Sequence, residues 1–344
     1  MNNLGGEGKL SPPACLNFHL SKPGSTDEVR RFAEKNMYGT SGRQRVNKDA
    51  FGNLYLKLPP IEEQKAIAKI LSSLDDKIEL NRQMNATLEA IARALFKAWF
   101  VDFEPVRANS ENRLSESASP EIAKVFPAEL ENSIPKGWRN IRLEELIDTV
   151  SVTHKFPNDT VIFLNTSDIG EGQVFRHTPS KVEGLPGQAK KSIKKNDILY
   201  SEIRPANKRY AYIDFDADDY VVSTKLMVLR AKSFVDPVFI YYILKSDEVV
   251  NWLQMLAESR SGTFPQITFD QLKKLEVLIP NEEVLKCYTN LLKAYFTKTN
   301  SSLRENQKLS EVRDSLLPRL ISGKIRVGAL EKKLVSQFRI NLYE

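Results

Sequence analysis

Cysteine is scarce in this sequence: Cys15 and Cys287 are the only two among 344 residues. Two cysteines so far apart exclude a disulfide framework and a CxxC metal site. No stretch approaches about 18 consecutive apolar residues, the length that a membrane-spanning helix needs. The first eight residues also lack the basic and then apolar plan of a secretory signal. We therefore expect a soluble, intracellular protein of a reducing cytoplasm.

Motifs for nucleotide and metal chemistry are missing as well. The glycine-rich run that ends at Lys9 is followed by Leu10, where a phosphate-binding loop needs Ser or Thr. The three histidines do not have the spacing of metal ligands; they are His19, His154 and His177. There is no glycine-rich dinucleotide loop and no methyltransferase Pro-Pro-Tyr motif.

One acidic run resembles a calcium-binding loop. It begins at Asp214, but Asp219 stands at the position that needs glycine, and Lys225 stands at the position that needs glutamate. A turn between two strands is the better interpretation. We expect no cofactor, no metal and no catalysis, although a nuclease site built from scattered carboxylates stays open.

Positive charge is concentrated in one segment. The chain has a formal net charge of +6 and a pI of about 9.0. Between Arg176 and Tyr210 nine basic side chains face only three acidic ones. This excess favours an anionic partner such as nucleic acid, and an ordinary solvated surface is the alternative.

The sequence repeats itself with an offset of 221 residues and no gaps. Each copy contains a short strand, Leu54–Leu58 and Leu275–Ile279, in which apolar residues alternate with other residues. Pro59 and Pro280 close the two strands, because proline cannot donate to a strand ladder. The match continues into a helical segment, where Leu71 corresponds to Leu292.

Both helical segments have the heptad spacing of a coiled-coil seam. The first seam is Ile67, Leu71, Leu74, Ile78, Asn81, Asn85, Leu88, Ala92 and Leu95. The second is Tyr288, Leu292, Tyr295, Thr299, Ser302, Asn306, Leu309, Arg313 and Leu316. We predict a parallel or antiparallel pair in which Asn85 and Asn306 hydrogen-bond to each other. Helices of roughly 35 residues would be about 50 Å long, the length of a spacer. Two ordinary amphipathic helices on separate domains are the alternative.

Between the two helices lies a mixed α/β block. Residues 109–131 are rich in Ser, Glu, Asn and Pro and predict a linker. A domain then begins near Ile134 and ends at Pro280. Its predicted strands are Val161–Asn165, Asp197–Tyr200, Tyr210–Asp214 and Tyr220–Leu229, and its predicted helical stretch is Pro237–Glu258. The fold class is therefore mixed α/β with two long helices.

Several segments resemble the specificity subunits of type I restriction-modification systems, which carry the family symbol HsdS. The matching segments are Leu58–Leu71, Leu74–Ile78, Leu95–Phe103, Ile134–Trp138, Asp197–Pro205, Ser261–Ile267 and Leu316–Ile325. The resemblance implies a non-catalytic protein that reads double-stranded DNA. It also implies methyltransferase and nuclease-translocase subunits as partners.

The same resemblance implies an order of recognition domain, spacer helix, recognition domain, spacer helix. The expected parts are residues 1–60 as a remnant recognition domain, 61–105 as the first spacer helix, 106–133 as a linker, 134–280 as a complete recognition domain, 281–327 as the second helix and 328–344 as a tail. The first block departs from the family because it is far shorter than the second and lacks the Ile-Pro-Lys-Gly-Trp opening. Two copies paired head to tail could read a palindrome. A family-derived scaffold or an inactive subunit is the alternative.

The candidate DNA-binding residues lie in the second block. Phosphate contacts need cations, and base edges are read by planar or amide groups in the major groove. The phosphate candidates are Lys190, Lys191, Lys194 and Lys195. The guanine candidates are Arg204, Lys208 and Arg209, and the adenine candidates are Asn165 and Gln266. A second group of nine basic residues lies between Lys286 and Val327 and favours a methyltransferase surface over the DNA backbone.

Overall fold

The structure is a computed structural model that describes residues 27–38, 45–46, 49–50 and 59–327. It divides into two compact units, residues 1–89 with 298–344 and residues 90–297. Within the described residues, no helix is both long and apolar enough to cross a membrane. The strand expected at Leu54–Leu58 and the glycine-rich run before Leu10 lie outside the described residues.

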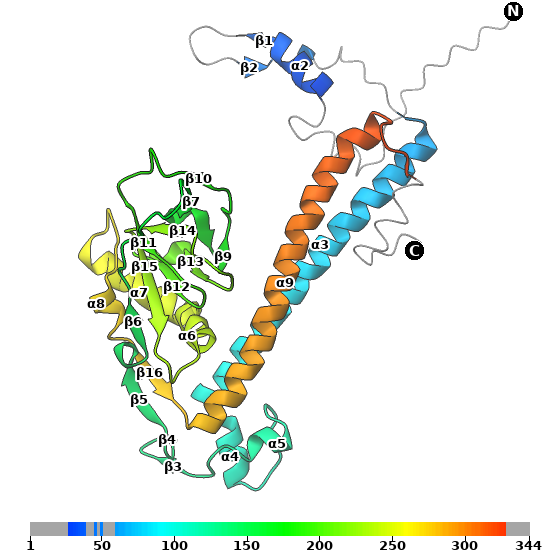
Figure 1. The fold of residues 1–344 in the computed structure, drawn as a ribbon. Coiled ribbons are helices and arrows are strands. Elements are labelled where there is room, and N and C mark those ends of the chain that lie inside the picture. The colour runs from blue at the N-terminus through cyan, green and yellow to red at the C-terminus, as the bar shows by residue number, and fades with distance from the viewer. Residues whose placement is uncertain (1–26, 39–44, 47–48, 51–58, 328–344) are drawn as a thin grey trace, which may run out of the picture. The chain divides into compact units, whose positions relative to one another are not determined.

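The first unit contains parts of two long helices that run antiparallel, α3 (Ile61–Phe96) and α9 (Glu282–Ile321) (Figure 1). Each helix begins one residue or two after a proline and carries two glutamates in its first turn. Acidic side chains at that end suit the helix dipole. Before them lie α2 (Asp27–Lys35) and a short pair of strands, β1 (Met37–Tyr38) and β2 (Arg45–Val46).

The antiparallel direction follows from the contacts within this unit. Arg313 pairs with Asp75, whereas Thr299, earlier in α9, accepts a hydrogen bond from Asn85, later in α3. The apolar half of the predicted seam is buried, and its residues are Ile67, Leu71, Leu74, Ile78, Leu309 and Leu316. Leu88 is only half-buried.

The polar middle of the seam does not pair as we predicted. The Asn81 amide, 1% exposed, donates to Asn306 Oδ1 and to Glu305 Oε2, both at 2.8 Å. Asn85 instead donates to the Thr299 carbonyl at 3.4 Å, and its Oδ1 is buried without a partner. The predicted Asn85–Asn306 bond was therefore wrong. Residues at equivalent repeat positions do not face each other here, because the two helices run in opposite directions and Asn306 faces Asn81.

In the second unit, α3 ends in a π-helical turn, η2 (Lys97–Val101). This turn directs Trp99 and Phe100 into the core, where both are buried. Trp99 packs edge-on against Phe126, and Phe100 does so against Tyr288 of α9. The seam candidates Ala92, Leu95, Tyr288, Leu292 and Tyr295 pack in this same cluster.

The segment expected to be a linker carries packed structure. Helix α4 (Glu104–Ser110) overlaps its start and α5 (Pro120–Ala123) lies within it. The indole nitrogen of Trp99 donates to the Ser117 carbonyl. The Glu104 carboxylate accepts hydrogen bonds from both Ser115 and Ser117 hydroxyls. Polar side chains thus hold this segment in place, although its composition is typical of a linker.

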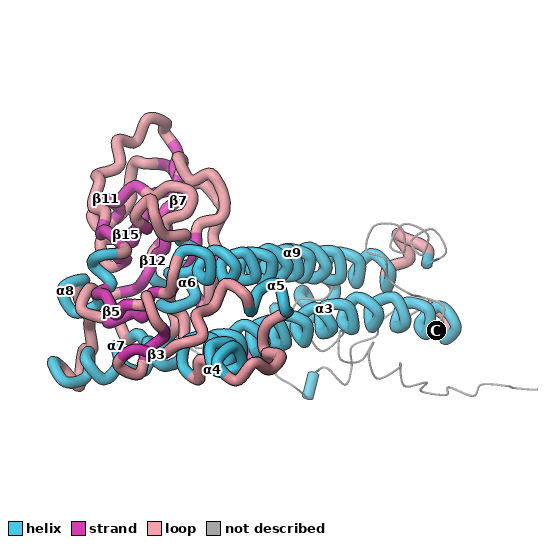
Figure 2. Tube along the Cα trace, turned by 90° about the horizontal axis from the view of Figure 1, so that it is seen from below, coloured by secondary structure: helices cyan, strands magenta, loops and turns pink. Residues whose placement is uncertain are grey.

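The α/β part of the second unit is layered. Its four-stranded sheets have the orders β10-β7-β14-β11 and β13-β12-β15-β6, and in Figure 2 the strands lie together with α6, α7 and α8 beside them. The strands are β3 (Leu130–Glu131), β4 (Ile134–Pro135), β5 (Arg139–Arg142), β6 (Ile147–Thr149), β7 (Thr160–Leu164), β8 (Ile169–Gly170), β9 (Gln173–Val174), β10 (Ser180–Lys181), β11 (Ala189–Ser192), β12 (Ile198–Ser201), β13 (Tyr210–Tyr212), β14 (Tyr220–Ser223), β15 (Leu226–Ala231) and β16 (Glu276–Ile279). The helices are α6 (Pro237–Leu244), α7 (Asp247–Arg260) and α8 (Phe269–Leu272), with short helical turns η3 (Leu143–Glu145), η4 (Thr166–Asp168) and η5 (Pro205–Asn207).

Strand β15 shows how the layers form. Leu226 and Val228 point to the core between the two sheets, whereas Met227 and Leu229 join the core that contains α6 and α7. Successive side chains of a strand point to opposite faces, so a strand with both faces covered is apolar throughout. The single strand predicted at Tyr220–Leu229 is in fact two, β14 and β15, which lie in different sheets and are separated by a two-residue turn.

Candidate nucleic-acid interface

Several strand ends meet at one edge of the two sheets. Strand β14 ends at Ser223 and is joined to the start of β15 by only Thr224 and Lys225. β14 pairs in parallel with β7, so Asn165 follows β7 at the same edge. β12 also ends here, at Ser201, because it runs antiparallel to β15. We call this the loop edge, and its residues are Asn165, Gln188, Lys190, Lys191, Glu202, Arg204, Lys208, Arg209, Lys225, Phe264 and Gln266.

The connection after β12 presents Arg204. Arg204 and Lys208 flank η5, and both have left-handed backbone angles, with φ of 45° and 51°. Such angles are uncommon for residues with side chains and persist only where the surroundings hold them. The Ala206 amide donates to Gln254 Oε1 of α7 at 3.0 Å, which fixes the η5 turn to this helix. The Arg204 side chain is exposed.

A second segment, residues 261–267, runs beside Arg204. The Arg204 amide donates to the Pro265 carbonyl, and its guanidinium contacts the Thr263 carbonyl at 3.4 Å. The Ile267 amide in turn donates to the Glu202 carbonyl. The Gln266 side chain accepts from Lys225 at 3.5 Å. Because Pro265 is bonded to Arg204 and Ile203 bridges to Gln266, the two predicted base readers Arg204 and Gln266 lie close together.

Lys191 has a different place from the one we expected. Its ammonium donates to the carbonyls of Thr224 and Leu226, at 3.0 and 2.8 Å. Burial lowers the pKa of Lys191, against the opposite influence of nearby Glu202. The side chain therefore holds the β14–β15 turn from inside and is not displayed as a phosphate contact. Its neighbour Lys190 is exposed.

The other candidates at this edge are partly engaged. Lys208 pairs with Asp247 at 2.8 Å, and Asp247 also pairs with Arg93. These cations lower the pKa of Asp247, with the hydrogen bond from Lys208 as the largest cause. Arg209 donates to Thr166 at 3.3 Å. Asn165 caps η4, because its Oδ1 accepts from the Thr166 amide.

Lys194 and Lys195 lie away from the loop edge. Lys191 contacts Leu226 at the start of β15, whereas the turn after Lys194 is fixed to Arg230 near the strand's end. Four residues of strand separate these points, about 13 Å. The predicted run of lysines is thus divided between two ends of the sheet.

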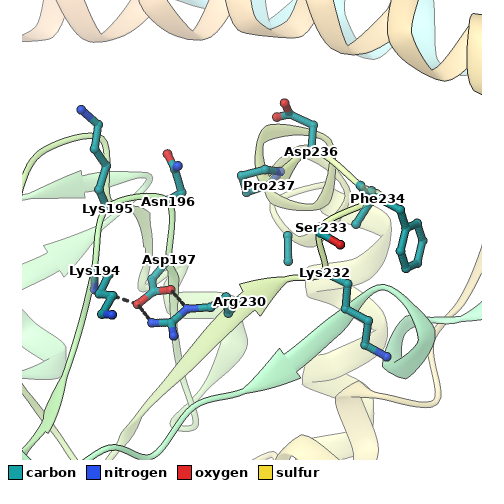
Figure 3. A pocket seen from close by; sticks show the side chains of 12 residues that line it. Lys194, Lys195, Asn196, Asp197, Arg230, Lys232, Ser233, Phe234, Asp236 and Pro237 are labelled. Carbon is teal, nitrogen blue, oxygen red and sulfur yellow. Dashed lines mark hydrogen bonds and ion pairs between the residues drawn. The ribbon is translucent and has the colours of Figure 1, made fainter.

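The two distant lysines line a hollow of about 510 Å³ (Figure 3). Asp197, only 1% exposed, accepts two hydrogen bonds from Arg230 at 2.7 and 2.8 Å and one from the Lys194 amide. Exposed Phe234 lies at the rim. Lys232 also lines the hollow, but its ammonium donates to the Glu144 carbonyl.

Our sequence reasoning missed Glu202, Lys225, Phe264 and Asp247. No local pattern distinguishes them from ordinary surface residues, although Phe264 lies inside the Ser261–Ile267 segment that carried the resemblance. In the part of the chain that the structure describes, no cluster of three or more histidine, cysteine, aspartate or glutamate side chains could hold a metal ion.

Comparison with known proteins identifies the family. A model described as the type I restriction modification DNA specificity domain matches residues 31–90 and 135–311, more than half of the chain. The chain belongs to the type I restriction-modification specificity family. The resemblance noted from the sequence is thereby confirmed, as is the mixed α/β fold class.

Two relatives show how much of a specificity subunit this family member spans. The Haemophilus influenzae type I restriction enzyme HindI specificity subunit is 42% identical over 183 residues, which cover 52% of this chain and 39% of that protein. The Methanocaldococcus jannaschii type I restriction enzyme MjaIX specificity subunit is 26% identical over 308 residues, which cover 86% of this chain and 66% of that protein. The chain thus spans less than two thirds of either relative.

A solved structure supports the fold of this family member. The S subunit of a type I restriction-modification system from M. genitalium aligns with a TM-score of 0.51 and 15% identity. The alignment covers 88% of this chain and 74% of that one. At this identity the likeness concerns the fold alone.

Proposed function

We propose that this chain reads one DNA half-site through the loop edge and carries no catalysis itself. The observation that supports the proposal most is the convergence there of Arg204, Lys225 and Gln266 from three separate segments. Guanidinium and amide groups are the side chains that read guanine and adenine edges in the major groove. The family's named role as a specificity domain agrees with this chemistry.

The site is preorganised for reading. Backbone hydrogen bonds fix Arg204 against Pro265, and the half-buried Lys191 ammonium fixes the turn that carries Lys225. Readers held on fixed loops lose less conformational entropy on binding than readers on mobile loops. Lys190, at the same edge, is the exposed candidate for a phosphate contact.

We further propose that methyltransferase and nuclease subunits join this chain, and that DNA reading takes place in the cytoplasm. The relatives are named as subunits of type I restriction enzymes, and the basic residues of α9 offer a surface to a partner. A second copy, paired head to tail, would supply the other half-site, because two-fold proteins read palindromic sites.

Selection from a random duplex pool tests the proposal. The full chain, assembled with its methyltransferase subunit, should enrich one motif, and R204A should weaken binding to it about 10-fold or more, the cost of a good bidentate contact. R176A, at an exposed residue outside the loop edge, is the matched control. A scaffold without DNA reading would enrich no motif, and an unchanged R204A variant would move the reading site elsewhere.

Methylation mapping in cells adds the arrangement of the half-sites. A palindromic methylation mark would support paired copies of this chain. An asymmetric split mark would show that another chain supplies the second half-site and would contradict the homodimer. Metal-dependent cleavage by the purified chain alone would contradict the non-catalytic role.

A further inference from the structure

Phe264 is an exposed aromatic side chain at the loop edge. It is 54% exposed and belongs to none of the hydrophobic clusters formed by the described residues. Its own amide donates to the Ser261 hydroxyl at 3.1 Å. The next residue, Pro265, accepts a backbone hydrogen bond from the Arg204 amide. The ring is therefore displayed on a fixed turn.

Exposure alone would carry little weight, since single apolar residues are common on protein surfaces. The neighbours of Phe264 make it informative. Arg204 contacts the carbonyl of Thr263, the residue before Phe264, and Gln266 follows two residues later. Along the segment, Phe264 therefore follows the residue that the Arg204 guanidinium contacts and precedes the Gln266 amide by two positions, and both of these groups suit base edges in a duplex.

The major groove offers one apolar group for such a ring. Among the four bases, only thymine presents a methyl group there, and phenylalanine is one of the side chains that contact it. Insertion of a phenylalanine between base pairs is the other known use, but it occurs in the minor groove, where guanidinium and amide side chains distinguish bases poorly. The flanking Arg204 and Gln266 favour the major groove.

We infer that Phe264 determines specificity by contacting the C5-methyl group of one thymine in the half-site. The inference rests on the proposed function and adds to it one base and one atom. Arg204 and Gln266 read hydrogen-bonding edges, and Phe264 distinguishes thymine from cytosine and from uracil by the methyl group. The same contact would accept 5-methylcytosine at that step only where its amino group is tolerated.

Single replacement of thymine by deoxyuridine tests the contact, because it removes only the methyl group. The probe is the duplex enriched by the full chain with its methyltransferase subunit, with each thymine replaced in turn. The wild type should lose about fourfold in affinity at one position, the value of one buried methyl group. On the thymine duplex, F264A should bind at least that much more weakly than the wild type. Its affinity should not fall further when deoxyuridine replaces thymine at that position.

Two variants serve as controls. F264L keeps an apolar side chain and should retain part of the deoxyuridine effect. F234A removes another exposed phenylalanine, 62% exposed, which lines the hollow at the other end of the sheet, and should leave the effect intact. Circular dichroism melting should be unchanged in F264A, because the ring packs in no core cluster.

The outcomes separate the inference from the proposed function. If a duplex is enriched but no deoxyuridine position weakens wild-type binding, or if F264A remains sensitive at that position, the methyl contact is overturned and the proposed function stands. If F264A loses the same affinity relative to the wild type on the thymine duplex and on every deoxyuridine duplex, the ring contributes by insertion or by a backbone contact. That result would also overturn the methyl contact. If no duplex is enriched, the proposed function fails and the contact fails with it.

Discussion

Substitution of Asn81 by alanine should loosen the middle of the helix pair. Asn81 is buried and donates to Asn306 Oδ1 and Glu305 Oε2, both at 2.8 Å. A neutral hydrogen bond contributes about 1 kcal/mol and a bond to a charged group somewhat more. Glu305 is one-third exposed and lies 3.9 Å from Lys77, so water and Lys77 replace part of what it loses. We expect a loss of about 2 kcal/mol in the local free energy of opening.

Native-state hydrogen exchange measures this quantity where it arises. Amides of α3 and α9 that flank Asn81 should exchange roughly 30-fold faster in N81A, since 1.4 kcal/mol corresponds to a factor of ten. In a double-mutant cycle with N306A, the two substitutions should be non-additive by about 1 kcal/mol. Q83A, at an exposed site of the same helix, is the control and should change exchange little.

The variant N81L distinguishes the effect of Asn81 on the stability of the helix pair from its effect on the register of the two helices. N81L replaces a buried amide with an apolar group and should stabilise the pair, at the expense of the fixed register that a buried asparagine gives. Unchanged exchange in N81A, or full additivity with N306A, would refute the assignment of this hydrogen bond as the polar tie of the helix pair.

Three further predictions concern the second unit. Burial would raise the pKa of Glu104, but hydrogen bonds, chiefly from Ser115 and Ser117 among several donors, lower it to about 2. Because the pKa of Glu104 is lower in the folded protein, its carboxylate stabilises the fold above about pH 4.5, and this contribution is lost as the pH falls toward 2. E104Q should therefore lower the free energy of unfolding by about 1–3 kcal/mol near neutral pH. In urea titrations it should also reduce the loss of stability between pH 4.5 and 2. G172A should lower the melting temperature by the equivalent of about 2 kcal/mol, because a Cβ would lie 2.2 Å from the Tyr241 hydroxyl at a φ of +90°. D247N should release Lys208 and speed amide exchange in η5 by a few-fold, as expected for an exposed ion pair of about 0.5–1 kcal/mol.

Each of these variants has a matched control. E111Q changes another partner of Arg113 that is exposed. G187A places a Cβ in open space at a residue without a positive φ. E248Q changes the exposed neighbour of Asp247 in the first turn of α7. Equal effects in a variant and its control would contradict the contact assigned to that variant.

The repeat predicted more of this fold than any single motif did. Its offset located both long helices and the strand at Leu275–Ile279, and the heptad seam identified Leu71, Leu74 and Leu309 as buried. Heptad spacing is the same for parallel and antiparallel pairs, so helix direction could not be predicted from it. For that reason the partner of Asn306 was assigned to Asn85, four residues away from Asn81.

The kinds of side chain at the loop edge could be predicted from the sequence, but which individual residues are exposed there could not. Arg204 and Gln266 were chosen because guanidinium and amide groups suit base edges, and the structure brings their two segments together. Whether Lys191 faces solvent depends on which carbonyls lie beneath it, and these come from a turn more than 30 residues later. Asn165 reaches this edge through the parallel β7–β14 pairing, which leaves no local pattern in the sequence.

The left-handed turn around η5 restricts how this surface can change. At Arg204 and Lys208 the backbone angles are costly for β-branched residues and tolerable for asparagine, aspartate, glycine and unbranched long side chains. Variation at these two positions is thus limited by the backbone to a small set of residues. Several of that set are hydrogen-bonding side chains, so a substitution that preserves the turn tends to exchange one hydrogen-bonding side chain for another.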